Sequence, residues 1–285
     1  MAESTRDIKR RIRGISNTRQ ITKAMELVSS AKLRKAREKM ARSRPYYNTV
    51  YDNIKQVLGQ TGNIKHPYLD VRDVENSLYI VITADRGLAG GFNSNVIRSV
   101  EHEIRDKKEN TQLILVGLKG REYFKGRGYN VAGEFVGMTE NPTFSHAQDI
   151  GKIAMDMFEE KEIDEVYIVY TEFVTTISQQ VKKLKLLPSE EMREGVSQKG
   201  SVVEFEPSPE EVLDYLIPKY IESVIYGALI ESSSSQQGAR RTAMESATEN
   251  AEEMIDELQL SFNRARQAAI TAEISEIVSG AEALE

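Results

Sequence analysis

The sequence lacks cysteine and tryptophan, and only three of its 285 residues are histidine. The absence of cysteine excludes disulfide bonds, thiolate metal sites and thiol-based redox switches. The three histidines, His66, His102 and His146, do not have the spacing of two metal ligands on one helix. We therefore expect this chain to hold neither a metal ion nor a cofactor.

Long hydrophobic runs are also absent. No apolar stretch reaches the roughly 18–20 residues that a membrane-spanning helix requires. The N-terminal sequence MAESTRDIKRRIRG has no apolar segment of the kind found in secretory signals. Its arginines suggest a mitochondrial transit peptide as the competing interpretation, but Glu3 and Asp7 are early acids and helical patterning continues past residue 40. We interpret the N-terminus as mature structure, which favours a bacterial source.

Recognisable catalytic motifs are missing too. The sequence contains no G-x-S-x-G, no H-E-x-x-H and no cysteine nucleophile. His146 follows a serine, but no acid is placed to complete a triad, so a helix-capping or surface role is expected for it. Paired acids such as Glu252 and Glu253 lie in charged runs typical of a solvated surface. The sequence predicts no catalytic residue.

Charge is distributed very unevenly along the chain. Residues 1–44 contain 14 Lys or Arg and 4 Asp or Glu, whereas residues 231–285 contain 4 basic and 11 acidic residues. Opposite charge at the two ends indicates that they face different partners or each other. The basic N-terminal part suits nucleic acid, an anionic membrane surface or an acidic protein partner. Composition alone does not separate these alternatives.

The first predicted element is one long helix from residue 4 to about residue 58. Its apolar and small residues recur at helical spacing; they are Ile8, Ile12, Ile15, Ile21, Met25, Val28, Leu33, Ala36 and Met40. No glycine lies between Gly14 and Gly59, and Pro45 is the only proline there and a candidate kink. At 1.5 Å per residue the helix would be roughly 75 Å long, which indicates a coiled coil or a stalk.

A second long helix is predicted from residue 208 onward. Ser208 is its expected N-cap, Pro209 occupies the first helical position, and Glu211 stands three residues after Ser208. Alanines and larger apolar residues then recur at spacings of three, four and seven. Pro218 and the run ESSSSQQG (residues 231–238) interrupt the regularity of this pattern.

The middle of the chain alternates in the manner of an α/β domain. Strands are predicted at residues 78–83, 113–116 and 166–170, with further strand within 173–188, and helices at 94–107, 119–127 and 145–161. Strands separated by helices of this length indicate βαβ units and a largely parallel sheet. Residues 59–77 are expected to be a linker and residues 188–207 a polar loop.

Together these elements predict one fold class, α/β plus a long antiparallel coiled coil. The N-terminal helix (residues 1–58) and the C-terminal helix (208–285) would pair with each other, and a central Rossmann-like α/β domain with a mostly parallel sheet (75–190) would lie between them in sequence. A basic helix beside an acidic helix also fits the charge asymmetry.

A glycine-rich segment, ITADRGLAGGFN, spans residues 82–93. It joins a predicted strand to a predicted helix, as phosphate-binding loops do. However, it lacks the lysine and hydroxyl of a P-loop and the glycine spacing of the dinucleotide fingerprint. We interpret it as a structural turn in which glycine permits positive φ. Asp85 and Arg86 are expected to form a local ion pair or a docking contact. An α/β nucleotide-binding enzyme with helical arms stays open as the alternative.

Four stretches resemble signatures of one family, the gamma subunit of F-type ATP synthases. They are TRQITKAMELVSSAKLRKA (residues 18–36), ITADRGLAGGFN (82–93), ARRTAMESATENA (239–251) and SFNRARQAAITAEISEIVSGA (261–281). Because they lie at both ends and in the middle, the resemblance covers essentially the whole chain. There are small departures: Ala84 and Ala89 stand where Ser and Cys are common, and Arg241 stands where an apolar residue is frequent.

The resemblance implies a bacterial-type central rotor shaft that performs no chemistry itself. Its partners would be the alpha and beta subunits of the catalytic hexamer, the epsilon subunit and the membrane c-ring, and it would bind no nucleic acid. Its rotation would couple ion flow through the membrane ring to ATP synthesis or hydrolysis on the partner subunits. It would lie peripherally on the cytoplasmic side of the cell membrane and contact the membrane only through its partners.

The resemblance also assigns roles to individual residues. It places Lys23 and Met25 beside an acidic lever segment of a catalytic subunit, although plain coiled-coil core is an alternative for Met25. It implies that five further residues contact the catalytic ring or brace the two helices: Arg240, Arg266, Gln267, Thr271 and Glu273. Another five would shape the foot of the rotor: Asp85, Arg86, Gly87, Gly90 and Gly91.

Overall fold

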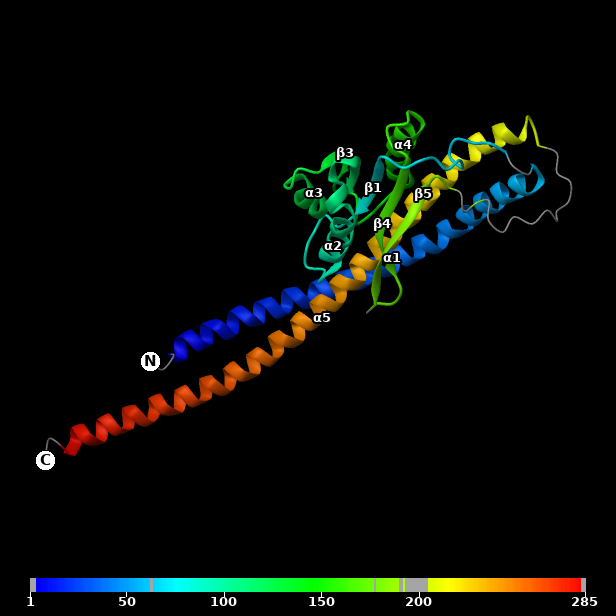
Figure 1. The fold of residues 1–285 in the computed structure, drawn as a ribbon. Coiled ribbons are helices and arrows are strands. Elements are labelled where there is room, and N and C mark those ends of the chain that lie inside the picture. Colours follow the sequence, from blue (N-terminus) through cyan, green and yellow to red (C-terminus); the bar gives the residue numbers. More distant parts are fainter. Residues whose placement is uncertain (1–3, 62–63, 177, 190–191, 193–204, 283–285) are drawn as a thin grey trace. The chain divides into compact units, whose positions relative to one another are not determined.

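The computed structural model describes residues 4–61, 64–176, 178–189, 192 and 205–282 (Figure 1). Its elements, in chain order, are α1 (Thr5–Thr61), β1 (Ser77–Ile82), α2 (Phe92–Ile104), the 3-10 helix η1 (Arg105–Asn110), β2 (Thr111–Val116), α3 (Leu118–Lys125), β3 (Asn130–Phe135), α4 (Phe144–Glu159), β4 (Glu165–Phe173), β5 (Gln179–Leu187) and α5 (Pro209–Glu282). The predicted loop at residues 188–207 lies mostly outside the described residues.

The chain folds into two compact units. The terminal unit consists of residues 1–29 and 241–285, and the central unit of residues 30–240. The N-terminal part of α1 and the C-terminal part of α5 form the terminal unit, and all five strands belong to the central unit.

Both predicted long helices are confirmed as α1 and α5. The N-cap of α5 is formed as expected, because the Ser208 hydroxyl accepts a hydrogen bond from the Glu211 N–H at 3.2 Å. Both helices continue through the residues that interrupt their sequence patterns: α1 stays helical through Pro45, and α5 through Pro218 and residues 231–238.

The serine-rich run stays helical because its hydroxyls find acceptors inside the protein. Ser234 donates to the Ile230 carbonyl at 3.0 Å, and Ser235 donates to the Thr171 carbonyl of β4 at 3.0 Å. Residues 232–238 are all buried. The polar stretch is therefore a packed layer against the sheet rather than a break in the helix.

The sheet has the strand order β3-β2-β1-β4-β5. Strands β3, β2, β1 and β4 are parallel, and β5 pairs antiparallel with β4. The predicted mostly parallel sheet is thus confirmed. Strand β3 was not predicted, because its sequence NVAGEF contains Gly133 and Glu134 and lacks the β-branched run of the inner strands.

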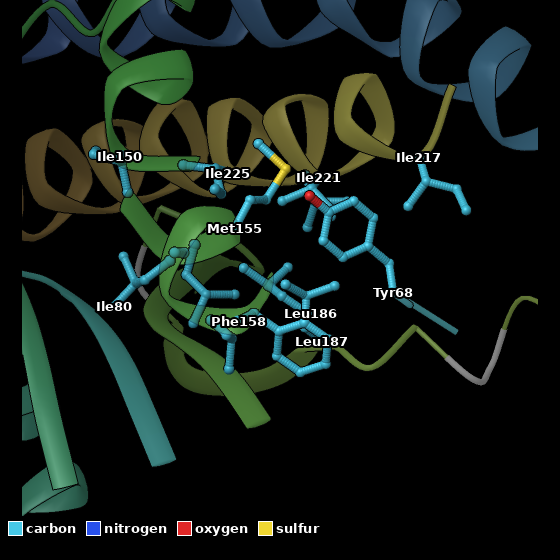
Figure 2. Packing of buried hydrophobic residues seen from close by; sticks show 14 of the residues in the cluster. Tyr68, Ile80, Ile150, Met155, Phe158, Leu186, Leu187, Ile217, Ile221 and Ile225 are labelled. Atoms are coloured by element: carbon cyan, nitrogen blue, oxygen red, sulfur yellow. The ribbon is translucent and has the colours of Figure 1, made fainter. Parts of the chain in front are cut away.

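Alternate residues of β1 separate two hydrophobic cores, one on each face of the sheet. Leu78, Ile80 and Ile82 belong to the core shared with α1, α4 and α5, part of which is drawn in Figure 2. Tyr79 and Val81 belong to the core formed with α2 and α3. Helices covering both faces explain why the central strands read as continuous apolar runs.

Candidate functional site: the glycine loop and the exposed helix surfaces

The glycine loop, defined here as residues 83–91, connects the end of β1 to the start of α2. In α/β folds, ligands bind beyond the carboxyl ends of the strands, where such loops lie. The side chains and helix ends that meet there therefore decide whether the loop forms a ligand site or a structural junction.

At the carboxyl ends of the strands, the Asp85 carboxylate occupies the place where a bound anion would otherwise lie. Its Oδ1 accepts hydrogen bonds from the N–H groups of Leu118 (3.1 Å) and Gly137 (2.8 Å). Its Oδ2 accepts from the N–H (3.0 Å) and the hydroxyl (2.7 Å) of Thr139. Leu118 is the first residue of α3, so this carboxylate occupies a helix N-terminus of the kind that binds phosphate elsewhere.

The electrostatics of Asp85 follow from these bonds. Burial raises its pKa, but the hydrogen bonds from Gly137, Thr139 and Leu118 outweigh burial and bring the pKa below its usual value. Asp85 is therefore a charged structural anchor, and it holds these donors instead of pairing with the neighbouring Arg86. Its geometry disfavours a nucleotide phosphate at α3.

The glycines of the loop play unequal parts. Gly90 has φ +54°, as expected for a glycine turn, whereas Gly87 and Gly91 do not adopt positive φ. The other positive φ belongs to Leu88, at 60°, a rare conformation for a leucine. The Leu88 side chain is 64% exposed. No pattern in the sequence singled out this strained, exposed apolar residue.

Arg240 joins α5 to the glycine loop inside the central unit. Its guanidinium lies 3.4 Å from Glu140 Oε1 and donates to Gln237 Oε1 (3.2 Å) and to the Gly87 carbonyl (3.5 Å). Only 7% of its side chain is exposed, and burial lowers its pKa. Because arginine stays charged nonetheless, the site contains a buried cation that needs its carboxylate partner.

Glu140 lies at the centre of the contacts between α1, α5 and the glycine loop, which we call the junction. Its Oε2 accepts from Lys32 of α1, and its Oε1 faces Arg240 of α5. Burial raises the pKa of Glu140, but Lys32 and Arg240 hold the pKa below its usual value. One carboxylate thus ties α1, α5 and the loop before α4 together. Neither Glu140 nor Lys32 was predicted as a site residue, because their contact spans 108 positions in sequence.

His146 has the capping role that was expected as one alternative. Its ring forms a capping box with Thr143 at the start of α4, where the Thr143 N–H donates to Nδ1 at 3.1 Å. Among the described residues, no three His, Asp or Glu side chains gather as a metal site would require. In the same part of the chain, no helix combines the length and apolarity needed to cross a bilayer.

In the terminal unit, α1 and α5 pair antiparallel. The hydroxyls of Thr22 and Thr248 lie 2.8 Å apart, and Arg19 lies 3.7 Å from Glu252. Residue numbers thus rise along one helix as they fall along the other. Among the predicted contact residues, Met25 is half-buried beside this seam.

Lys23 extends toward solvent from the same helix. Its side chain is 56% exposed and forms an ion pair at 3.1 Å with Glu26, which is itself buried. The two residues lie about one helical turn apart, and an ion pair of this kind contributes little to the stability of the fold. More than half of the Lys23 side chain is exposed to solvent.

The predicted residues near the end of α5, namely Arg266, Gln267, Thr271 and Glu273, are all exposed. The Thr271 hydroxyl donates to the Gln267 carbonyl at 2.9 Å. The same stretch also exposes apolar side chains by 43% to 71%: Leu260, Ile270, Ile274, Ile277 and Val278. Ile270, Ile274 and Ile277 recur at helical spacing, and exposed apolar residues grouped in this way are typical of a surface that contacts another molecule.

The sequence and the fold both resemble those of known proteins. A family model described as ATP synthase matches residues 4–284. The chain is 55% identical over 289 residues to an ATP synthase gamma chain of Alkaliphilus metalliredigens, with all of both chains covered. It is 50% identical over 302 residues to the sodium-ion-specific ATP synthase gamma chain of Acetobacterium woodii, again over the full length of both.

Solved structures resemble the fold as well. A chain of the Tetrahymena thermophila mitochondrial ATP synthase, from its central stalk and c-ring, shares 26% identity with a TM-score of 0.61 over 80% of this chain and 99% of that chain. A chain from the Euglena gracilis mitochondrial ATP synthase reaches a TM-score of 0.72 at 21% identity, over 98% of this chain and 94% of that one.

Proposed function

The chain belongs to the ATP synthase gamma-chain family, and from this premise we propose that it is the rotating central shaft of an F-type ATP synthase. Its rotation inside a hexamer of alpha and beta subunits couples ion flow through a membrane c-ring to ATP synthesis or hydrolysis. The catalytic sites lie on the partner subunits, and this chain moves them through their conformations. The helix segments 1–58 and 208–285 act as the shaft and residues 75–190 as its foot.

The observation that carries the proposal is the antiparallel pairing of two unusually long helices, of 57 and 74 residues. In the central unit, Val50 and Ile54 of α1 share a buried core with Ile217 and Ile221 of α5. In the terminal unit, the helices meet at Thr22 and Thr248. Paired helices resist bending and twisting better than one helix does, which transmission of torque requires.

Asymmetry explains how such a shaft controls catalysis. A single shaft inside a pseudo-threefold ring presents a different face to each catalytic site at any moment. Each site therefore has a different conformational equilibrium. Rotation passes these differences around the ring, and because coupling is reciprocal, hydrolysis on the ring drives the shaft in return.

Surface residues and the half-buried Met25 are assigned the contacts that this mechanism needs. Lys23 and Met25 face an acidic lever segment of a catalytic subunit, and the exposed apolar and polar residues of α5 after residue 260 turn within the ring. The glycine loop contacts neighbouring subunits at the foot, with the exposed Leu88 side chain as its apolar anchor. The chain is peripheral to the cell membrane on the cytoplasmic side, and the epsilon subunit and the c-ring connect it there.

Purification of the native complex tests the proposal. We expect one copy of this chain for each ring of six larger nucleotide-binding chains, measured by mass spectrometry of the intact assembly. The purified chain alone should hydrolyse no ATP. ATPase activity from this polypeptide by itself would instead support the alternative, an α/β nucleotide-binding enzyme with helical arms.

Replacing Met25 by lysine tests the coupling role more finely. A new cation beside an acidic lever strengthens their attraction in one rotational position and hinders release. We expect assembly and ATP hydrolysis to survive while the number of ions pumped per ATP falls roughly two- to fivefold, a coupling loss of about 0.4–1 kcal/mol. Proton or sodium uptake and ATPase rate are measured on the same vesicles.

The control for this substitution is Val71→Lys, the same kind of change at an apolar residue that is 60% exposed and lies outside both long helices. It should leave pumping per ATP unchanged. If Met25→Lys pumps ions in the normal proportion to its ATPase rate, the contact assigned to Met25 is wrong.

A further inference from the structure

A cavity of about 760 Å³ lies within the central unit, between α1, α5 and the β4–β5 hairpin. Its size falls within the range of about 300–1,000 Å³ that is typical of sites for small organic molecules. Tyr170 and Lys182 stand opposite each other in the β4–β5 register, so both project from the sheet face that closes the cavity. None of the predicted subunit contacts involves this cavity.

Aromatic rings form its walls. Phe144 at the start of α4 lies edge-on to Tyr46 of α1, with ring centres 6.1 Å apart, and edge-on to Tyr226 of α5 at 5.5 Å. Tyr47 of α1 lines the same space. Aromatic faces carry partial negative charge, so a ring-lined cavity attracts cations as well as apolar groups.

Two carboxylates, Glu172 and Glu231, line the cavity. Glu231 of α5 accepts hydrogen bonds from the Tyr170 hydroxyl and the Phe173 N–H. Burial raises the pKa of Glu231 and Glu172 raises it further, while the charge of Lys182 and the two hydrogen bonds offset part of this rise. Among the described residues, no cation forms an ion pair with Glu231.

The other charges of the cavity are already neutralised or lie in solvent. Lys182 lies 2.8 Å from Glu172 and pairs with it. Arg44 lines the cavity from an exposed position on α1, where water screens its charge. The half-buried Glu231 carboxylate, which Lys182 attracts without forming an ion pair with it, therefore favours a further positive charge beside it.

We propose that this cavity binds an organic ammonium compound with an aromatic or aliphatic body. The ammonium group donates to the Glu231 carboxylate, and the body packs among Tyr47, Phe144 and Tyr226. The binding of such a cation gives the half-buried carboxylate an ion-pair partner and covers apolar ring surface at the same time. This site is separate from the rotor contacts and does not depend on them.

Titration calorimetry with dibenzylamine tests the site, with dibenzyl ether as the neutral probe of similar shape. We expect the full-length protein to bind the amine at least about tenfold more tightly than the ether, because a charge-assisted hydrogen bond is about twice as strong as a neutral one. Glu231→Gln should reduce the affinity for the amine to that of the ether. Glu211→Gln, an exposed residue on the same helix, should leave both affinities unchanged.

A second variant keeps the test independent of the carboxylate. Gly227 of α5 lines the cavity, and a Cβ added to it would meet no atom within 4 Å. Gly227→Leu should therefore fold, fill the cavity and lower the affinity for both probes at least tenfold. The inference is overturned if the unaltered protein binds amine and ether equally, or if Gly227→Leu binds them undiminished. It is also overturned if the assembled complex does not bind the amine.

Discussion

Replacing Arg240 by alanine is expected to lower the free energy of unfolding of the full chain by about 3 kcal/mol. The substitution removes the cation that faces Glu140 and the donor to the Gly87 carbonyl. It leaves Glu140 partly buried, with only Lys32 as its partner. Breaking a buried ion pair costs more than the pair contributes, because the charge that stays behind, here Glu140 with Lys32, has less compensation than before.

Urea titration followed by circular dichroism measures this loss, and Arg264→Ala provides the control. Arg264 is an exposed residue of the same helix, so its removal should change stability by less than about 0.5 kcal/mol. Glu140→Gln in the Arg240→Ala background should recover part of the loss, since the stranded charge is then removed. Equal stability of Arg240→Ala and the unaltered protein would show that the junction contributes nothing.

Replacing Asp85 by asparagine should cost a similar amount, about 2–4 kcal/mol. An asparagine side chain offers one acceptor oxygen where the carboxylate uses two, so its NH₂ group must face donors that Asp85 now accepts. The first turn of α3 and the Gly137–Thr139 turn lose their shared anchor. Asp73→Asn, at an exposed aspartate, is the matched control and should be nearly neutral.

The effect of Asp85 has a definite pH dependence. Its pKa in the folded protein lies below that of the unfolded chain, so its contribution is fully present above the ordinary aspartate pKa of about 4. The contribution is lost as the pH falls through the lowered folded-state pKa. The stability difference between the unaltered protein and Asp85→Asn should therefore be constant near neutral pH and shrink in acid. A difference that grows in acid would contradict the assigned role.

Local patterns in the sequence determined the elements whose apolar residues repeat regularly. The spacing of apolar residues predicted α1 and α5, and the Ser208 cap marked where α5 begins. Continuous apolar runs predicted β1, β2 and β4, because strands covered on both faces carry little else. Strand β3 escaped prediction since an edge strand with Gly133 and Glu134 owes its shape to pairing with β2, a contact that no local pattern records.

The sequence also determined the family, because its signatures are long and lie throughout the chain. It did not determine what the individual polar residues do. Only the tertiary structure revealed that Asp85 caps α3, that Arg240 and Lys32 share Glu140, and that the serine-rich run is buried. Hydrogen bonds and ion pairs between residues far apart in sequence depend on how the elements pack. Apolar periodicity, in contrast, can be detected within the sequence of a single helix or strand.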